Sequence, residues 1–468
     1  MRPSHLFAAS LILATVVRAA DPAALSPAAP VDSAAEMVNR IFAEALAHGQ
    51  AHDQLRKLTT EYPGRLGGSQ SLEGAVQWGA RVLGGMGLTR VYLQDCKVTH
   101  WERGAPESVE LLAARGPEPL AAVALGNSAA TPDGGLTAGV VEVHSLAEVE
   151  KLGRAGVTGK IVFFNRPMDP TLFATMRAYG VAGDQRNQGP GVAARFGAVA
   201  ALSRSLTLAH DDVPHAGNST FPPGVAPIPA AALSLVAADR LSAALAANPS
   251  TQVRLAIHAR NFPDAPSHNV IGEIRGTEFP DQVIVVGGHL DSWDIAPGAH
   301  DDGAGIVQAI EVLRLFSALG LKPRHTLRCV LFVNEENGRG GSTAYVTAAK
   351  AAPERHFFAV ESDAGGFAPT GFNVGSPQDP ALHQRAARWR PLFEPWGIWN
   401  FTKGAGGADI STLMLQGVPV AGLTPDSQRY FDYHHAVSDS IDKVNPRELH
   451  LGAAACAALI WLVDQQGL

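Results

Sequence analysis

The chain has 468 residues, of which 46% are hydrophobic and 17% charged, with a formal net charge of -7. This length exceeds one ordinary domain and predicts two or three. There is no basic excess to neutralise phosphates, so nucleic acid is not an expected partner. The three cysteines permit one disulfide at most and form no Cys-x-x-Cys pair, which excludes a disulfide framework and that type of zinc or redox motif.

Residues 1–20 are predicted to be a signal peptide. Arg2 and His5 precede the apolar stretch "LFAASLILATVV", and "VRA" supplies small residues near the expected cleavage point. The apolar run is shorter than the roughly 20 residues that a membrane-spanning helix needs. An uncleaved anchor is the alternative. We expect an exported protein, periplasmic or secreted, with no transmembrane segment in the mature chain.

The first elements after the leader are helical. Periodic apolar residues predict helices over 32–60, the stretch "YPGRLGGSQS" predicts a turn, and "LEGAVQWGARVLGGMG" a further helix. The stretches "RVYLQDCKVTHW" and "SVELLAA" are then predicted to be strands. We assign residues 32–110 to the first part of a domain that resumes later in the chain.

The pattern changes between residues 111 and 261. Short apolar stretches such as "AGVVEVH", "GKIVFFN" and "TQVRLAI" alternate with loops rich in Gly and Pro, which predicts a separate β-rich insert. The stretch "GRAGVTGKI" has the wrong glycine spacing for a phosphate-binding loop, and Ile161 rather than Ser or Thr follows its lysine.

Residues 262–468 have the pattern of an α/β domain. Continuous apolar strands, "VIVVGGH", "TLRCVLFV" and "HFFAVES", are each followed by a helical segment or a turn. Such strands predict a mostly parallel central sheet flanked by helices. In sheets of this kind, ligands bind at the carboxyl ends of the strands.

Histidines and carboxylates follow these strands where each one ends. His289 follows the first strand, Glu335 and Glu336 the second, and Asp363 the third. The same edge of the sheet should receive Asp301, which precedes the next helix, and the late histidines of "FDYHHAVSDS". So many carboxylates would repel one another without cations. Mixed imidazole and carboxylate ligands suit zinc, with manganese or cobalt as possible substitutes.

The number of ligands fits two metal ions, each with one histidine, one terminal carboxylate and a shared bridging carboxylate. Two such ions can clamp both oxygens that take part in a hydrolysis. One glutamate must remain free as a general base. Because neighbouring side chains of an extended chain alternate, one of Glu335 and Glu336 can bind metal while the other faces the water. Asp291, two residues after His289, is positioned to hold the imidazole tautomer.

The order of these motifs resembles a known family. His-x-Asp, Asp-Asp-Gly-x-Gly, Asn-Glu-Glu, a single Asp and His-x-x-x-Asp follow one another as in the co-catalytic zinc exopeptidases, which include bacterial leucyl aminopeptidases. The stretches "TGKIVFFNRP" and "RFGAVAAL" also resemble the protease-associated insert of that family. The resemblance covers nearly all of the mature chain.

The resemblance implies a role for each residue. One zinc is held by His289 and Asp363, the other by Glu336 and His435, and Asp301 bridges the two. Glu335 matches the general base of the family, and Asp302 matches the residue after the bridging ligand. Asp291 is the second candidate catalytic residue, through its effect on the His289 imidazole. His435 rather than His434 is assigned as the ligand because Asp439 then completes His-x-x-x-Asp. His434, Asp409 and Trp293 are candidates for the substrate pocket.

The resemblance implies hydrolysis of dipeptides or short peptides, in which a metal-bound hydroxide attacks a carbonyl near one chain end. Three alternatives remain: an aminopeptidase of the same family, a glutaminyl-cyclase-like acyl transferase with one zinc, and a receptor-like binding protein without a complete metal site. The residues do not decide which substrate terminus is recognised, because an acidic group would bind an amine and a basic group a carboxylate. A homodimer is a further possibility that the family implies.

Overall fold

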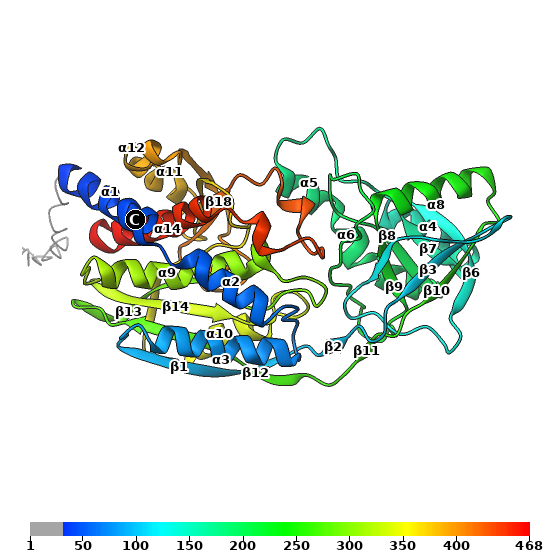
Figure 1. The fold of residues 1–468 in the computed structure, drawn as a ribbon, viewed down its shortest axis with the longest axis horizontal. Helices are drawn as coiled ribbons and strands as arrows, with labels where there is room; N and C mark the ends of the chain where they lie inside the picture. The colour runs from blue at the N-terminus through cyan, green and yellow to red at the C-terminus, as the bar shows by residue number, and fades with distance from the viewer. Residues whose placement is uncertain (1–30) are drawn as a thin grey trace, which may run out of the picture.

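The computed structural model describes residues 31–468, so the predicted signal peptide lies outside the described residues. The described chain forms two eight-stranded sheets with their helices and one small two-stranded sheet. Figure 1 shows the first sheet with its covering helices on one side of the molecule and the second sheet on the other. The two-stranded sheet, β2 (Trp101–Glu102) with β11 (Arg260–Asn261), lies along the connections between them.

The first sheet is parallel at its centre. Strands β13, β14, β15 and β18 form its parallel middle, and antiparallel pairs with β12 and β16 continue it on both sides. The strands in spatial order are β1 (Arg90–Val98), β12 (Ala265–Ile274), β14 (His325–Phe332), β13 (Phe279–His289), β15 (Arg355–Glu361), β18 (Val420–Pro425), β16 (Pro369–Gly375) and β17 (Asn400–Lys403). The predicted α/β class with a mostly parallel central sheet is confirmed.

Helices cover both faces of this sheet because its strands are apolar on both sides. Ile284 and Val286 of β13 pack into a core with the helices α1 (Val31–His48), α2 (Ala51–Glu61), α3 (Gln70–Gly84), α9 (Ala304–Ala318) and α14 (Pro446–Gln466). The alternate residues Val283 and Val285 pack on the opposite face with α10 (Gly340–Ala351) and α13 (Ser411–Met414). The first and last described helices, α1 and α14, lie side by side (Figure 1). The small helices α11 (Leu382–Ala386) and α12 (Arg390–Phe393) pack near one edge.

The second sheet lies between residues 108 and 256. Its strands in spatial order are β4 (Gly116–Pro119), β3 (Ser108–Ala113), β10 (Gln252–Ala256), β6 (Leu136–Val143), β7 (Ile161–Phe164), β8 (Ala200–Arg204), β9 (Ala230–Leu233) and β5 (Ala122–Ala124). The four strands β6 to β9 are parallel neighbours. Parallel strands need long crossovers, and these contain helices.

Helices are the main difference from the sequence analysis in this part, where only strands and loops were predicted. They are α4 (Leu146–Val157), α5 (Thr175–Ala182), α6 (Asp184–Asn187), α7 (Gly189–Arg195) and α8 (Leu235–Ala247). Two glycines interrupt the pattern of α4, one of them with non-helical backbone angles at Gly153. In α8, six of thirteen residues are alanines that give only a weak apolar stripe. These helices are therefore difficult to recognise from periodicity.

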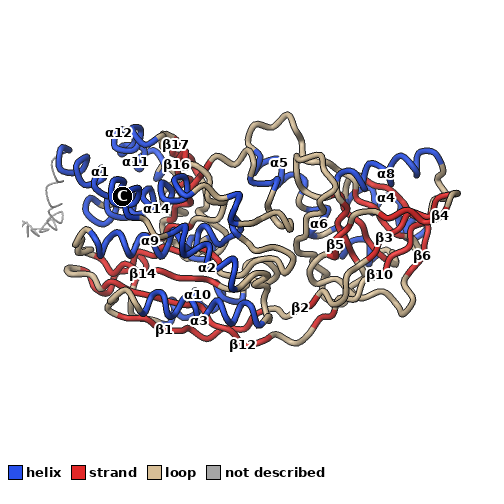
Figure 2. The backbone as a smooth tube through the Cα atoms, in the orientation of Figure 1, coloured by secondary structure: helices blue, strands red, loops and turns tan. Residues whose placement is uncertain are grey.

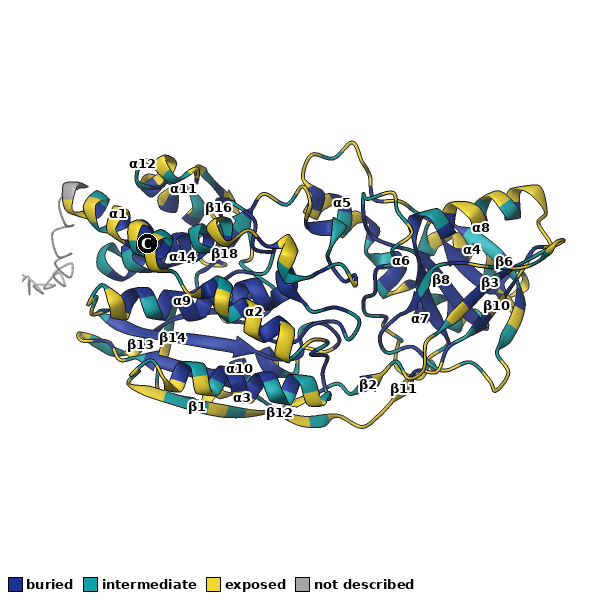
Figure 3. Cartoon of the chain, viewed as in Figure 1, coloured by how far each residue is buried: buried dark blue, intermediate teal, exposed yellow. Residues whose placement is uncertain are grey.

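Loops gather between the two sheets, as the tan segments of Figure 2 show. The backbone amide of Ala216, from the second sheet's side, donates to the carbonyl of His435 (2.8 Å). The residues at this junction are largely buried (Figure 3). All three cysteines are free, with Cys329 and Cys456 buried in the core. Within residues 31–468, no helix combines the length and apolar character that crossing a membrane requires.

Candidate metal centre

The first site residues lie at the carboxyl ends of three neighbouring parallel strands, at one edge of the sheet. His289 is the last residue of β13, Glu335 and Glu336 lie in the turn after β14, and Asp363 follows β15. His289 Nε2 lies 3.3 Å from a carboxylate oxygen of Asp301 and 3.6 Å from one of Asp363. Side chains distant in sequence therefore meet because their strands are paired in register.

Asp301 is held by its backbone in the turn before α9. The carboxylate of Asp439 accepts hydrogen bonds from the amides of His300 (2.7 Å) and Asp301 (3.0 Å). The peptide bond between Asp301 and Asp302 is cis. Asp302 itself accepts from the amides of His289 (3.0 Å) and Gly305 (2.9 Å). The two adjacent aspartates thus have different surroundings, with Asp301 turned toward the histidines and Asp302 bound to backbone amides.

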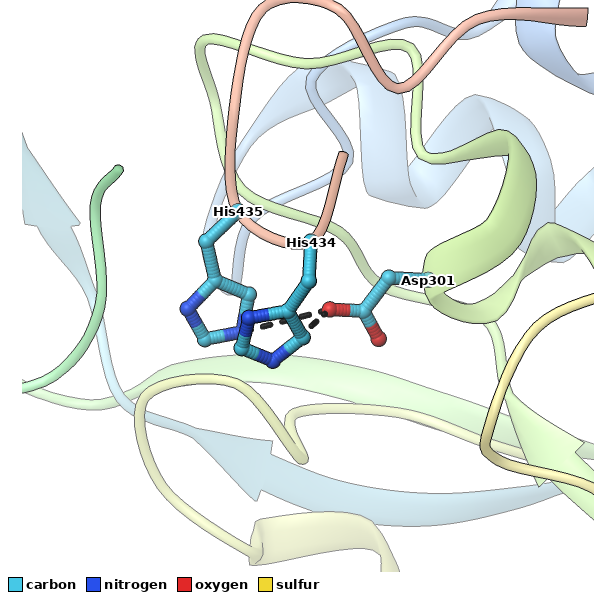
Figure 4. A group of neighbouring side chains, drawn as sticks. All are labelled: Asp301, His434 and His435. Atoms are coloured by element: carbon cyan, nitrogen blue, oxygen red, sulfur yellow. Dashed lines mark ion pairs between the residues drawn. The ribbon is translucent and has the colours of Figure 1, made fainter. Parts of the chain in front are cut away.

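His434 and His435 both reach Asp301, and Figure 4 shows their rings stacked beside its carboxylate. His435 Nε2 lies 3.2 Å from Asp301 and 3.1 Å from Glu336, whereas His434 Nε2 lies 3.6 Å from Asp301. His435 Nδ1 lies 3.2 Å from the carbonyl oxygen of Ala216. A hydrogen bond donated there leaves the lone pair on Nε2, as metal ligation requires. This geometry supports His435 over His434 as the ligand.

The buried, closely spaced carboxylates of this cluster favour a bound cation. Burial and the neighbouring Asp301 raise the pKa of Glu336 to about 8. Burial opposes protonation of His435, but Glu336 and Asp301 outweigh it and raise its pKa to about 10. One oxygen each of Asp301 and Glu336 is buried without a hydrogen-bond partner. Within the described residues, potential ligand atoms meet in three overlapping groups that contain His289, Asp301, Asp302, Glu336, Asp363, His434 and His435. These imidazole and carboxylate donors fit zinc.

Glu335 and Asp291 lie beside this group. The Asp291 carboxylate accepts from the amides of Glu335 and Glu336, both at 3.1 Å. His289 Nδ1 is 3.0 Å from the Asp291 carbonyl oxygen and 3.7 Å from its carboxylate. Asp291 therefore positions both glutamates as well as the imidazole. Burial raises the pKa of Glu335 to about 7, which is in the range that suits a group that takes up and releases a proton.

The three predicted pocket residues lie in different places. His434 lines a cavity of about 450 Å³ that also contains His289, Asp301, Glu335, Glu336, Asp363 and His435. Asp409 is buried, and both of its carboxylate oxygens lack a hydrogen-bond partner. Trp293 is also buried and packs into the core of the second sheet, with its ring 5.6 Å from that of His435. Neither Asp409 nor Trp293 is among the residues that line the cavity.

Comparisons with known proteins match this geometry. The family model described as "Peptidase family M28" matches residues 269–460. Carboxypeptidase Q of Bos taurus is 35% identical over 422 residues, which are 89% of this chain and 86% of that protein. Carboxypeptidase Q of Xenopus laevis is 36% identical over 418 residues, 89% of this chain and 86% of that protein. The chain belongs to peptidase family M28. The resemblance to the co-catalytic zinc exopeptidases and the prediction of a metallopeptidase are confirmed.

Solved structures extend this family assignment. The M28 peptidase precursor of Shewanella amazonensis is 33% identical, with a TM-score of 0.87 over 92% of this chain and 97% of that one. A zinc aminopeptidase of Bacillus subtilis has a TM-score of 0.64 at 18% identity, over 88% of this chain and 93% of that one. The second likeness concerns the fold alone. The M28 fold therefore extends beyond the matched residues 269–460 to most of the chain.

Several residues around this M28 site were missed in the sequence analysis. Arg186 comes from the short helix α6 beyond any recognisable motif, and Arg339 follows Glu335 and Glu336 in the same turn. Both line the cavity. Arg339 carried a usable signal, since a basic residue two positions after "NEEN" must lie close to the glutamates. Arg186 carried none, because its approach depends on the packing of the two sheets.

Arg65 is a third missed residue, and it is fully buried. Its guanidinium donates to the backbone carbonyls of four residues: Leu290 (2.7 Å), Pro297 (2.6 Å), Gly298 (3.1 Å) and Tyr62 (3.2 Å). Burial lowers its pKa to about 10, opposed by Asp291 and then Asp439, so it stays charged. Arg65 thus ties together the loop that carries Asp291 and the turn that precedes Asp301.

Replacing Arg65 should destabilise the fold. We expect Arg65→Met to lower the free energy of unfolding by about 3–5 kcal/mol, because it removes a buried cation from nearby carboxylates and leaves carbonyls without donors. Urea unfolding followed by circular dichroism measures the change. The exposed Arg447 provides a matched control as Arg447→Gln, which should be neutral within about 0.5 kcal/mol. Equal stability of the two variants would contradict the role of Arg65.

Proposed function

We propose that this M28 peptidase is a zinc exopeptidase that hydrolyses dipeptides or short peptides; the name of its relative carboxypeptidase Q supports cleavage near a chain end. One observation carries the proposal: five imidazole and carboxylate ligands converge beside Glu335 in one cavity. His289 and Asp363 would hold one zinc, Glu336 and His435 the other, and Asp301 would bridge them. Bound there, two zinc ions would polarise the scissile carbonyl and lower the pKa of the attacking water.

The protein's own groups supply the proton transfers in this proposal. Glu335 accepts a proton from the attacking water on its carboxylate and then donates it to the nitrogen of the leaving residue. Asp291 holds the backbone of Glu335 and Glu336 in place through the two amide hydrogen bonds. His289, Asp301, Glu336 and His435 are buried, which strengthens the electrostatic interactions among them. His434 lies where it can contact the substrate, at the edge of the same cavity.

The alternative functions are less well supported. A receptor-like protein does not need a complete ligand set with a general base. A one-zinc acyl transferase does not need both His289 and His435 with a carboxylate between them. An aminopeptidase of the same family has the same ligands, so substrate recognition has to distinguish it from a carboxypeptidase. We also propose export by the leader over residues 1–20, a protease-associated insert over 111–261 and a homodimer.

The proposal is tested with four substrates: a free dipeptide, its N-acetylated form, its C-amidated form and an amino-acid anilide. We expect the mature protein to hydrolyse the free dipeptide only after zinc is supplied, and the chelator-treated protein to be inactive. The blocking group that abolishes hydrolysis identifies the recognised terminus. Failure to bind zinc would contradict the ligand assignment and favour the receptor alternative.

A further inference from the structure

The cavity beside the candidate metal centre contains two arginines, in different positions. Arg186 comes from α6, beside His435, and Arg339 directly precedes α10, beside Glu335. A cation in such a cavity would attract the carboxylate of a peptide substrate. The surroundings of the two guanidinium groups differ and indicate which one is available to bind a substrate carboxylate.

Arg186 is engaged within the protein. Its Nη2 donates to the hydroxyl of Tyr179 (2.6 Å), and its Nη1 donates to the carbonyl of Ala216 (3.4 Å). Its Nε is closed off from solvent and has no hydrogen-bond partner. Arg186 therefore supports the cavity wall behind His435.

Arg339 is more accessible. Its side chain is 48% exposed, and Nη2 lies 3.8 Å from Glu335 Oε1. Its hydrogen bond is from Nη1 to the carbonyl of Ala408, at 3.3 Å. A guanidinium has five N–H donors, so Arg339 retains donors for a ligand. These donors lie in the cavity on the side of the general base.

The backbone at Arg339 has a conformation that favours glycine, with φ +110°. The neighbouring contacts fix it there. Arg339 N donates to Asn334 O (2.5 Å), and a Cβ on Gly338 would lie 2.1 Å from Asn334 Oδ1. A Cβ on Gly340 would lie 1.8 Å from Lys97 O. A strained non-glycine residue at a site suggests that its side chain has a function there.

We propose that Arg339 is a specificity-determining residue that binds the free α-carboxylate of the residue released from the substrate. The inference rests on the proposed function, in which Glu335 protonates the leaving nitrogen. In an α-amino acid the carboxylate carbon is two bonds from that nitrogen. The carboxylate of the leaving residue thus lies on the Glu335 side of the cavity, within reach of a guanidinium 3.8 Å from Glu335. This assignment makes the enzyme selective for a free carboxyl terminus.

The kinetic test compares alanyl-alanine with alanyl-alanine amide. Arg339→Gly removes the guanidinium and accepts the positive φ without strain. We expect kcat/KM for the free acid to fall about tenfold, mainly through KM, since the ion pair is half-exposed. The loss for the amide should be smaller, so that the ratio of kcat/KM for the acid to kcat/KM for the amide falls. Arg447→Gln, a charge-matched control at an exposed residue that does not line the cavity, should change neither. Equal losses on both substrates would mean that Arg339 serves only Glu335, and would overturn the inference.

A binding measurement is independent of turnover. Calorimetric titration of the zinc-loaded Glu335→Gln protein with both probes should show tighter binding of the acid than of the amide. The double variant Glu335→Gln/Arg339→Gly should bind the two alike. Equal affinities while Arg339 is present would overturn the inference even in an active enzyme. A preference for the acid that depends on Arg339, in a protein that hydrolyses neither probe, would support it and contradict the proposed function alone.

Discussion

Glu335→Gln is expected to lower kcat for a dipeptide by about 10²–10⁴-fold, the contribution of a general acid–base group. The amide has nearly the same shape as the carboxylate but cannot accept the proton of the attacking water. The Asp291 carboxylate binds the backbone amide of Glu335, so this contact does not depend on the replaced side chain. Burial raises the pKa of Glu335 to about 7, which matches the carboxyl to this role near neutral pH.

Three measurements separate this expectation from a loss of structure. Steady-state kinetics gives kcat, elemental analysis gives zinc per chain, and thermal unfolding gives Tm. Only kcat should change in Glu335→Gln. Glu118→Gln, at an exposed ion pair with Arg240, is the matched control and should retain full activity. Undiminished turnover by Glu335→Gln with zinc bound would contradict the assignment of Glu335 as the general base.

The sheet and the ligands at its edge could be predicted because the information is local. An apolar strand that ends in His, Glu or Asp is visible in a few residues, and parallel pairing then brings the ends of β13, β14 and β15 together. His289, Glu336 and Asp363 follow from this rule alone. Asp301 and His435 needed the order of motifs, since neither follows a strand.

The supporting residues could not be predicted in the same way. Arg65 binds Leu290, 225 residues away, and no periodic pattern marks such a contact. His434 and His435 are adjacent in the chain, so the sequence distinguishes them only by one position in the motif. In the structure, the carbonyl of Ala216 lies next to His435 Nδ1 and helps to orient that ring. Asp409 is an acidic residue in a glycine-rich loop, and the sequence gives no sign that it is buried rather than exposed.

Removing the Asp301 carboxylate is expected to abolish most of the stabilisation by zinc. Its oxygens lie 3.3 Å from His289 Nε2 and 3.2 Å from His435 Nε2, so it is the group shared by both halves of the cluster. A ligand at one hundred times its Kd stabilises the folded state by about 2.7 kcal/mol. For a chain of this size the corresponding rise in Tm is about 3 °C. The wild-type protein should show this rise after zinc replaces chelator, and Asp301→Ala should show little of it.

The comparison of zinc-induced shifts tests the metal site without any substrate. Asp442→Ala removes an exposed carboxylate that pairs with Lys443, and this control should keep the wild-type shift. Asp439, which holds the backbone of Asp301, remains in place in Asp301→Ala, so the turn itself should persist. A full shift in Asp301→Ala would mean that zinc stabilises the protein somewhere other than between His289 and His435. That result would contradict the shared carboxylate and, with it, the arrangement of two ions on which the proposed chemistry depends.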